Sequence, residues 1–177
     1  MRADAGVDGA LLIGGERVPA DDVFRAYAPA LGATVAPDFA VATGAHVAQA
    51  CWLADAAFDA FRETAPEHRA SFLESVAEGL EAIAQPLVAR AALESGLPVA
   101  RLAGECARTA GQLRLFAQVL REGRWATVVI DTAQPDRAPL PRPDLRMRRI
   151  AVGPVAVFGA SNFPLAFSVA GGDTASA

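Results

Sequence analysis

A stretch without any charged side chain, residues 153–170, is the feature that most constrains the fold. A membrane-spanning helix needs roughly 20 predominantly apolar residues, whereas prolines, glycines and polar residues interrupt this stretch. A short apolar run bounded by turn residues is typical of a central strand covered on both faces. We therefore expect a buried strand over residues 154–158, a turn at Gly159 and a helix opening over residues 162–168. A membrane span is the disfavoured alternative.

Upstream of this stretch, apolar residues recur at helical spacing along three segments. A further helix is expected over residues 86–94, ended by Gly96. Thr64 and Glu67 have the spacing of a capping box, and Gly123 is expected to end the last helix. The three stripes are Val47, Cys51, Ala54, Phe58 and Phe61; Phe72, Val76, Leu80 and Ile83; and Leu102, Cys106, Leu113, Phe116 and Leu120.

Strand signals lie on both sides of this helical region. Gly14 and Gly15 separate two short apolar runs, which predicts a β-hairpin. Residues 19–44 mix Pro, Asp and Ala without a clear period, and we expect an extended loop there. Residues 126–131 and 145–152 have strand character and are separated by a proline-rich loop. The sequence therefore predicts a strand pair after the helices.

Four arginines accompany this strand pair, at positions Arg142, Arg146, Arg148 and Arg149. A cluster of this kind could bind phosphate. A simpler interpretation is that the arginines form the polar face of an exposed strand and shield its edge from association. Both interpretations remain open from the sequence.

Composition excludes several function classes. The 177 residues are 53% hydrophobic and 20% charged, which is typical of a globular domain. The net charge of −4 gives no basic field for nucleic acid. Cys51 and Cys106 form neither a metal-ligand spacing nor a disulfide framework, so we expect no metal site and a cytoplasmic location. Met1–Asp4 begins no apolar run long enough for a signal peptide.

Asn162 is the only asparagine in the chain and stands in an otherwise apolar run. One interpretation is an amide donor to a developing oxyanion. The other is a helix N-cap, for which asparagine is also favoured, and spacing alone favours the cap. A strand followed by a helix N-terminus is also where α/β sheets bind nucleotides. The absence of G-x-G-x-x-G makes that signal weak.

The sequence GASNFPL over residues 159–165, followed by GGDTA over residues 171–175, resembles the aldehyde dehydrogenase superfamily at its Asn-Phe-Pro motif. It is most similar to the branch that contains 2-oxoglutarate semialdehyde (2,5-dioxopentanoate) dehydrogenases. The resemblance covers nearly the whole chain, because the Gly-Gly hairpin, the helices, ESGLP over residues 94–98 and the basic strand pair follow the family order.

This resemblance implies an α/β, aldehyde-dehydrogenase-like fold, of which the chain is an N-terminal fragment. Residues 1–125 would be the N-terminal hairpin and the helical part of the cofactor-binding domain. Residues 126–152 would be strands of the oligomerisation flap. Residues 153–177 would be the first strand and helix start of a Rossmann-like parallel sheet, truncated before its neighbours.

The resemblance also implies a reaction, the oxidation of a small aldehyde or semialdehyde to a carboxylic acid with NAD or NADP. Asn162 resembles the oxyanion-hole asparagine of the family. Phe158, Gly159, Ala160 and Ser161 resemble the backbone strip that lies beside the cofactor. The implied partners are the small-molecule aldehyde and, in the full-length form, further copies of the protein, with no nucleic acid and no membrane.

Departures from the family pattern are large. The family's cysteine nucleophile, its general base and its ribose-binding lysine-glutamate pair would lie beyond residue 177, and the chain contains no lysine. Cys51 and Cys106 lie on apolar stripes, where we expect buried small hydrophobes and not a nucleophile. The isolated chain is therefore expected to be inactive. The alternative is a non-catalytic, truncated scaffold or oligomerisation module.

Overall fold

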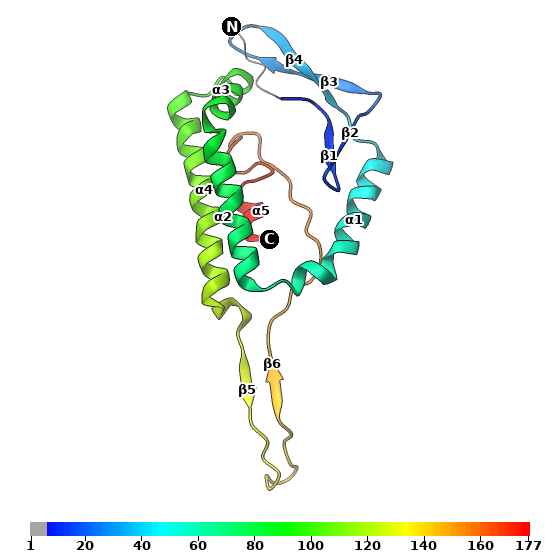
Figure 1. Cartoon of the computed structure of the whole chain (residues 1–177), viewed down its shortest axis with the longest axis vertical. Coiled ribbons are helices and arrows are strands. Elements are labelled where there is room, and N and C mark those ends of the chain that lie inside the picture. The colour runs from blue at the N-terminus through cyan, green and yellow to red at the C-terminus, as the bar shows by residue number, and fades with distance from the viewer. Residues whose placement is uncertain (1–6) are drawn as a thin grey trace.

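The computed structural model describes residues 7–177, so the expectation about Met1–Asp4 lies outside the described residues (Figure 1). The strands are β1 (Leu11–Ile13), β2 (Glu16–Val18), β3 (Val23–Ala28), β4 (Ala33–Ala40), β5 (Val129–Asp131) and β6 (Leu145–Met147). The helices are α1 (Gly44–Arg62), α2 (Pro66–Ala82), α3 (Ala84–Ser95), α4 (Val99–Glu122), a 3-10 turn (Arg124–Ala126) and α5 (Gly172–Ser176). In this part of the chain the strands form three separate antiparallel pairs.

The predicted hairpin at Gly14 and Gly15 is confirmed. Ile13 pairs with Glu16 across a two-residue turn, in which both glycines have positive φ, 63° and 84°. A turn with two left-handed central residues matches the twist of the flanking strands and strongly favours glycine.

The extended loop predicted for residues 19–44 is wrong, because most of this region is the β3–β4 hairpin. Arg25 pairs with Asp38 and Ala26 pairs with Val35, so Ala36 and Pro37 form a bulge between them. Proline has no N–H to donate to a ladder and is tolerated at such bulges. The bulge interrupts the alternation of side chains, which is why the sequence shows no clear period here.

Two helix-level predictions near α1 need correction. The stripe that includes Val47, Cys51 and Phe61 lies on one helix, but these side chains are exposed. The predicted capping box at Thr64 and Glu67 does not form, because the Thr64 hydroxyl donates to the Ala60 carbonyl oxygen instead. A capping box does begin α1, where Thr43 Oγ1 accepts from the His46 N–H and His46 Nδ1 accepts from the Thr43 N–H.

Helices α2 and α4 pack side by side and form the main helical contact of the structure. Their shared core contains Ala77 from α2 together with Ala110 and Leu113 from α4. Of the stripe predicted here, Val76 and Leu80 pack against this core, whereas Phe72 and Ile83 are exposed. The buried stripe predicted for the last helix is largely confirmed in α4. Gly123 ends it in the left-handed conformation, as predicted.

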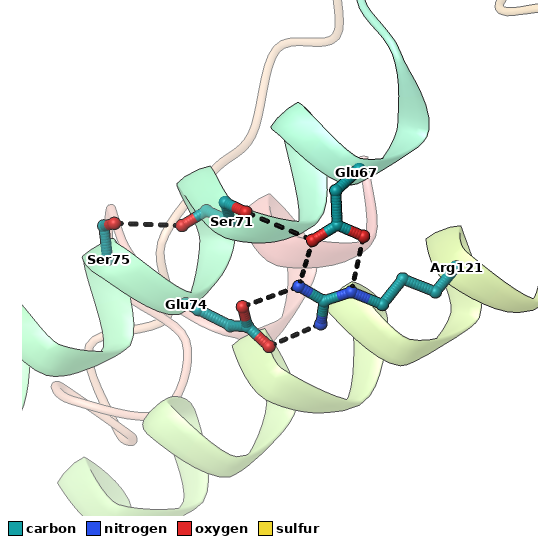
Figure 2. Close-up of polar contacts among 5 residues, drawn as sticks. All are labelled: Glu67, Ser71, Glu74, Ser75 and Arg121. Atoms are coloured by element: carbon teal, nitrogen blue, oxygen red, sulfur yellow. Dashed lines mark hydrogen bonds and ion pairs between the residues drawn. The ribbon is translucent and has the colours of Figure 1, made fainter.

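Charged side chains close the same interface at its solvent edge (Figure 2). The Arg121 guanidinium donates to the Glu67 carboxylate at 2.7 and 2.9 Å and to the Glu74 carboxylate at 2.6 and 2.9 Å. Arg114 makes a similar two-pronged contact with Glu81. These hydrogen bonds hold the pKa of Glu67 and of Glu74 below the ordinary value, because Arg121 favours the charged carboxylate.

The predicted strand pair after the helices is present but short. β5 and β6 pair from Val129 opposite Met147 to Asp131 opposite Leu145, and the hairpin extends away from the helices as an arm (Figure 1). Arg142 donates to the Thr132 carbonyl oxygen across this arm. This contact supports the structural interpretation for Arg142.

The buried strand predicted for residues 154–158 and the helix predicted for residues 162–168 are both wrong. Residues 154–158 have no strand partner and are exposed, since no neighbouring strand covers them in the described part of the chain. Residues 161–170 form successive turns, and the helix begins only at Gly172. Among the described residues, no helix has the length and apolar character that crossing a membrane requires.

We expect the thermal midpoint of unfolding to fall as the pH drops below the ordinary glutamate pKa of 4.5. Because the folded-state pKa of Glu67 and of Glu74 is lowered, their stabilising effect is complete above the unfolded-state pKa. It is lost as the pH falls through the folded-state pKa. The measurement is the midpoint by circular dichroism between pH 7 and pH 3, for the wild type and Arg121→Met. The variant should show a weaker or reversed dependence on pH, and equal slopes would contradict this account.

Candidate active-site loop

Residues 159–172, which we call the Asn162 loop, fold back on themselves through backbone hydrogen bonds. The Ala160 N–H donates to the Phe167 carbonyl oxygen at 2.8 Å, and the Phe167 N–H donates to the Phe163 carbonyl oxygen at 3.0 Å. A further bond joins the Gly172 N–H to the Ala166 carbonyl oxygen at 3.0 Å. The loop is therefore a compact set of turns, in which neither backbone group of Leu165 has a backbone partner among the described residues.

Three polar side chains on successive turns of α4 supply the missing partners. Glu105 is only 6% exposed. Its carboxylate accepts from Arg101 Nε at 3.0 Å and from the Leu165 N–H at 3.1 Å. The Thr109 hydroxyl donates to the Leu165 carbonyl oxygen at 2.7 Å. Both backbone groups of Leu165 are thus bound by side chains of one helix.

Arg101 extends the same contact to the candidate catalytic residue. Its Nη2 donates to the Asn162 carbonyl oxygen at 2.6 Å, while its guanidinium carbon lies 4.9 Å from the centre of the Phe163 ring. We call Arg101, Glu105 and Thr109 the α4 clamp. The clamp fixes the main chain at Asn162 and leaves the side chain of Asn162 exposed.

Apolar contacts anchor the loop in the same place. Leu165 is buried together with Val88 and Ala91 of α3 and with Leu102 and Cys106 of α4. This packing removes apolar surface from water and so holds the middle of the loop against the helices. The hydrogen bonds of the clamp then fix its orientation.

Two edge-on aromatic rings complete the loop. The rings of Phe163 and Phe167 meet at nearly right angles, with centroids 5.7 Å apart. The Arg108 guanidinium carbon lies 5.5 Å from the centre of the Phe167 ring. Aromatic pairs and cation–π contacts of this geometry are stabilising.

Gly171 lies against the loop backbone so closely that no side chain fits. A Cβ atom there would lie 2.7 Å from both the Ala166 carbonyl oxygen and the Ser168 nitrogen. Its φ of −72° is open to any residue, so the requirement for glycine at this position is steric.

The structure places the five predicted site residues at one end of this loop. Asn162 does not cap a helix, because the N-cap of α5 is Gly171, so the N-cap interpretation is wrong. The segment that includes Gly159, Ala160 and Ser161 leads into the loop, and Phe158 before it is 88% exposed. The predicted cofactor strip and the predicted oxyanion donor are therefore adjacent and accessible.

The two cysteines differ in their exposure. Cys106 is buried as predicted, and burial, with a smaller effect of the Glu81 charge, raises the pKa of its thiol. A raised pKa disfavours the reactive thiolate. Cys51 is exposed on α1, so the prediction that it is buried is wrong. Within residues 7–177, no group of three or more His, Cys, Asp or Glu side chains could hold a metal ion.

Sequence reasoning missed the α4 clamp. The sequence feature that could have indicated it is a polar residue, Thr109, in the apolar stripe of α4 between Cys106 and Leu113. Glu105 and Thr109 occupy helix positions that the 3.6-residue period reserves for the core. A buried charged residue on such a face needs a partner, but the sequence does not indicate that the partner lies about 60 residues later.

Comparison with known proteins identifies relatives of the chain. A family model described as the aldehyde dehydrogenase family matches residues 18–175. Alpha-ketoglutaric semialdehyde dehydrogenase 2 of Azospirillum brasilense is 56% identical over 171 residues, covering 96% of this chain and 33% of the relative. Alpha-ketoglutaric semialdehyde dehydrogenase of Acinetobacter baylyi is 48% identical over 177 residues, covering 96% of this chain and 32% of the relative. The chain thus spans about a third of the length of these curated relatives.

A solved structure supports the fold independently. Proline utilization A from Bdellovibrio bacteriovorus superposes with a TM-score of 0.80 at 21% identity, covering 98% of this chain and 17% of that one. At this identity the likeness concerns the fold alone. Together with the family match, it confirms the aldehyde-dehydrogenase-like fold class predicted from the sequence.

Replacing Gly171 by alanine should destabilise the Asn162 loop. The new Cβ atom would overlap main-chain atoms that cannot move aside as a flexible side chain can, so we expect a loss of about 1–3 kcal/mol in the free energy of unfolding. The matched control is Gly104→Ala on α4, where nothing lies within 4 Å of the new atom. That change should stabilise by roughly 0.5–1 kcal/mol. Urea unfolding measures both, and a Gly171→Ala chain as stable as the wild type would refute the steric account.

Proposed function

The chain belongs to the aldehyde dehydrogenase family, and on that premise we propose that the protein containing it oxidises an aldehyde to a carboxylic acid with NAD or NADP. The observation that carries this proposal is the Asn162 loop, which holds the family's Asn-Phe-Pro motif against α4 with the Asn162 side chain exposed. The main chain is fixed while the amide stays accessible to a ligand. This is the arrangement that a preorganised donor requires.

Asn162 is proposed to donate its side-chain N–H to the carbonyl oxygen of the bound aldehyde. Negative charge develops on that oxygen when a nucleophile attacks the carbonyl carbon, and a positioned donor stabilises this charge. The nearby N–H groups of Ala160, Phe163 and Leu165 already have partners, so they are not the donors proposed here.

The strip from Phe158 to Ser161 is proposed to lie beside the nicotinamide cofactor. The small residues Gly159, Ala160 and Ser161 allow a flat ligand to approach the main chain closely, and the exposed Phe158 ring offers an apolar surface next to it. The residues present therefore fit such a cofactor. When bound, it would accept the hydride that leaves the aldehyde carbon.

A semialdehyde of 2-oxoglutarate is the proposed substrate. Two observations support it. The amino-acid sequence around Asn162 resembles that branch of the family, and two relatives, at 56% and 48% identity, are named alpha-ketoglutaric semialdehyde dehydrogenases. A cytoplasmic location and assembly into homo-oligomers belong to the same proposal. So does the division into residues 1–125, 126–152 and 153–177.

A second candidate is a non-catalytic scaffold or oligomerisation module. The observation in its favour is the β5–β6 arm, which carries exposed apolar side chains at Val128, Ile130, Leu140, Leu145 and Met147. Exposed apolar strands invite association. An enzyme that assembles through its arm would show the same exposed residues, so an assay of aldehyde oxidation separates the two candidates.

Asn162→Ala in the full-length protein should lower kcat by about 10²–10³-fold, which is the usual effect of removing one oxyanion donor. The measurement is NADH or NADPH formation with 2-oxoglutarate semialdehyde and a panel of short aldehydes. Gln118→Ala removes an amide from the exposed face of α4 and should leave turnover unchanged. Unchanged turnover in Asn162→Ala would reject the assigned donor. The absence of aldehyde oxidation by the wild type would favour the scaffold.

A further inference from the structure

The α4 clamp binds three peptide groups of the Asn162 loop. Arg101 reaches the carbonyl of Asn162, Glu105 reaches the N–H of Leu165, and Thr109 reaches the carbonyl of Leu165. The three side chains are spaced four residues apart, so they lie along one face of α4. Each contact ends on the main chain of the loop and not on its side chains.

We propose that Arg101, Glu105 and Thr109 are positioning residues that set the orientation of the Asn162 amide for the reacting carbonyl oxygen. The inference rests on the proposed function of Asn162. None of the three side chains is proposed to touch substrate or cofactor, so their effect on the reaction passes through Asn162.

Glu105 is the centre of the clamp because it joins the other members. One carboxylate oxygen accepts from Arg101 at 3.0 Å, and the other accepts from the Leu165 N–H at 3.1 Å. Its side chain is 7% exposed, whereas that of Arg101 is 40% exposed. A buried carboxylate without these partners would be strongly unfavourable, so Glu105, Arg101 and the loop hold one another in place.

The geometry of Arg101 explains why a lysine would be a poor substitute. Arg101 Nε binds Glu105 while Nη2 binds the Asn162 carbonyl oxygen at 2.6 Å. The planar guanidinium holds these two donors at a fixed angle and also packs on the Phe163 ring. A lysine ammonium is a single point charge on a flexible stem and cannot reproduce this fork.

A second arginine–glutamate pair offers a matched contrast. Arg90 and Glu94 on α3 have the same four-residue spacing, with Arg90 Nε 2.5 Å from the Glu94 carboxylate. Arg90 also donates to the Ala36 carbonyl oxygen and lies over the Phe39 ring. The hydrogen bond and the cation–π contact of Arg90 outside α3 end on the β3–β4 hairpin, whereas those of the clamp end on the Asn162 loop.

The test compares Glu105→Gln, Arg101→Lys and Thr109→Val in the full-length enzyme, each alone and combined with Asn162→Ala. Glu94→Gln is the matched control. The readouts are kcat and KM for the aldehyde, and hydrogen exchange of the amides in residues 159–172. Circular dichroism establishes that each variant is folded. If Glu105→Gln does not fold, the other two variants still test the clamp. Arg101→Lys changes a partly exposed side chain, and Thr109→Val keeps the shape of the threonine.

We expect each clamp variant to lower kcat by about 10–10²-fold, the range expected when a reacting group is misplaced by up to about 1 Å. KM should change little, and exchange in the loop should become faster. In the Asn162→Ala background the same changes should cause little further loss of kcat, because residues that act as a unit are not additive. Glu94→Gln should leave kcat and loop exchange unchanged.

The outcomes separate the two proposals. Losses that add fully to that of Asn162→Ala, or faster loop exchange with unchanged kcat, would overturn the positioning role while leaving the proposed function intact. An Asn162→Ala enzyme with unchanged kcat would overturn the proposed function itself, and with it the reason for positioning that residue.

Discussion

Close packing of α2 against α4 is the contact on which the rest of the structure depends. Alanines such as Ala77 and Ala110 line the interface and let the helix backbones approach each other, and the fork of Arg121 ties the two helices together at the solvent edge. Because α2 supports α4 along much of its length, the other buried side chains of α4 have fixed positions. They can therefore act as attachment points for α3 and for the Asn162 loop.

The buried face of α4 carries both apolar and polar side chains, which contribute differently to the structure. Leu102 and Cys106 form an apolar core with α3 and Leu165, and this contact contributes stability with little directional preference. Glu105 and Thr109 lie on the same face, and their hydrogen bonds fix the orientation of the Asn162 loop. Hydrogen bonds can do this because they weaken steeply when their geometry is distorted. Polar residues inside a core are costly unless every group is satisfied. Their presence here is explained by the loop that they bind.

The sequence was sufficient to predict α1 to α4 and the first hairpin, because these depend on local spacing and on glycine at chain reversals. It failed at β3–β4, where the bulge at Ala36 and Pro37 breaks the alternation of the strands. It also failed at residues 154–158, because a strand exists only with a hydrogen-bonded partner and an apolar run does not specify one. Asn162 could be singled out by resemblance. The clamp could not, since Arg101 and Asn162 lie 61 residues apart and meet only in the folded chain.

The clamp and Pro164 together restrict the main chain that carries the exposed Asn162 side chain, the donor proposed above. The clamp fixes the Asn162 carbonyl on one side of Pro164 and the Leu165 N–H on the other. The proline ring restricts its own φ to about −65°, so few free torsions remain between the two anchored groups. Cation–π contact with Arg101 further restricts Phe163, which occupies the remaining position. Rigidity at Asn162 therefore comes from a helix and a proline, without the regular hydrogen-bond ladder of a strand or a helix.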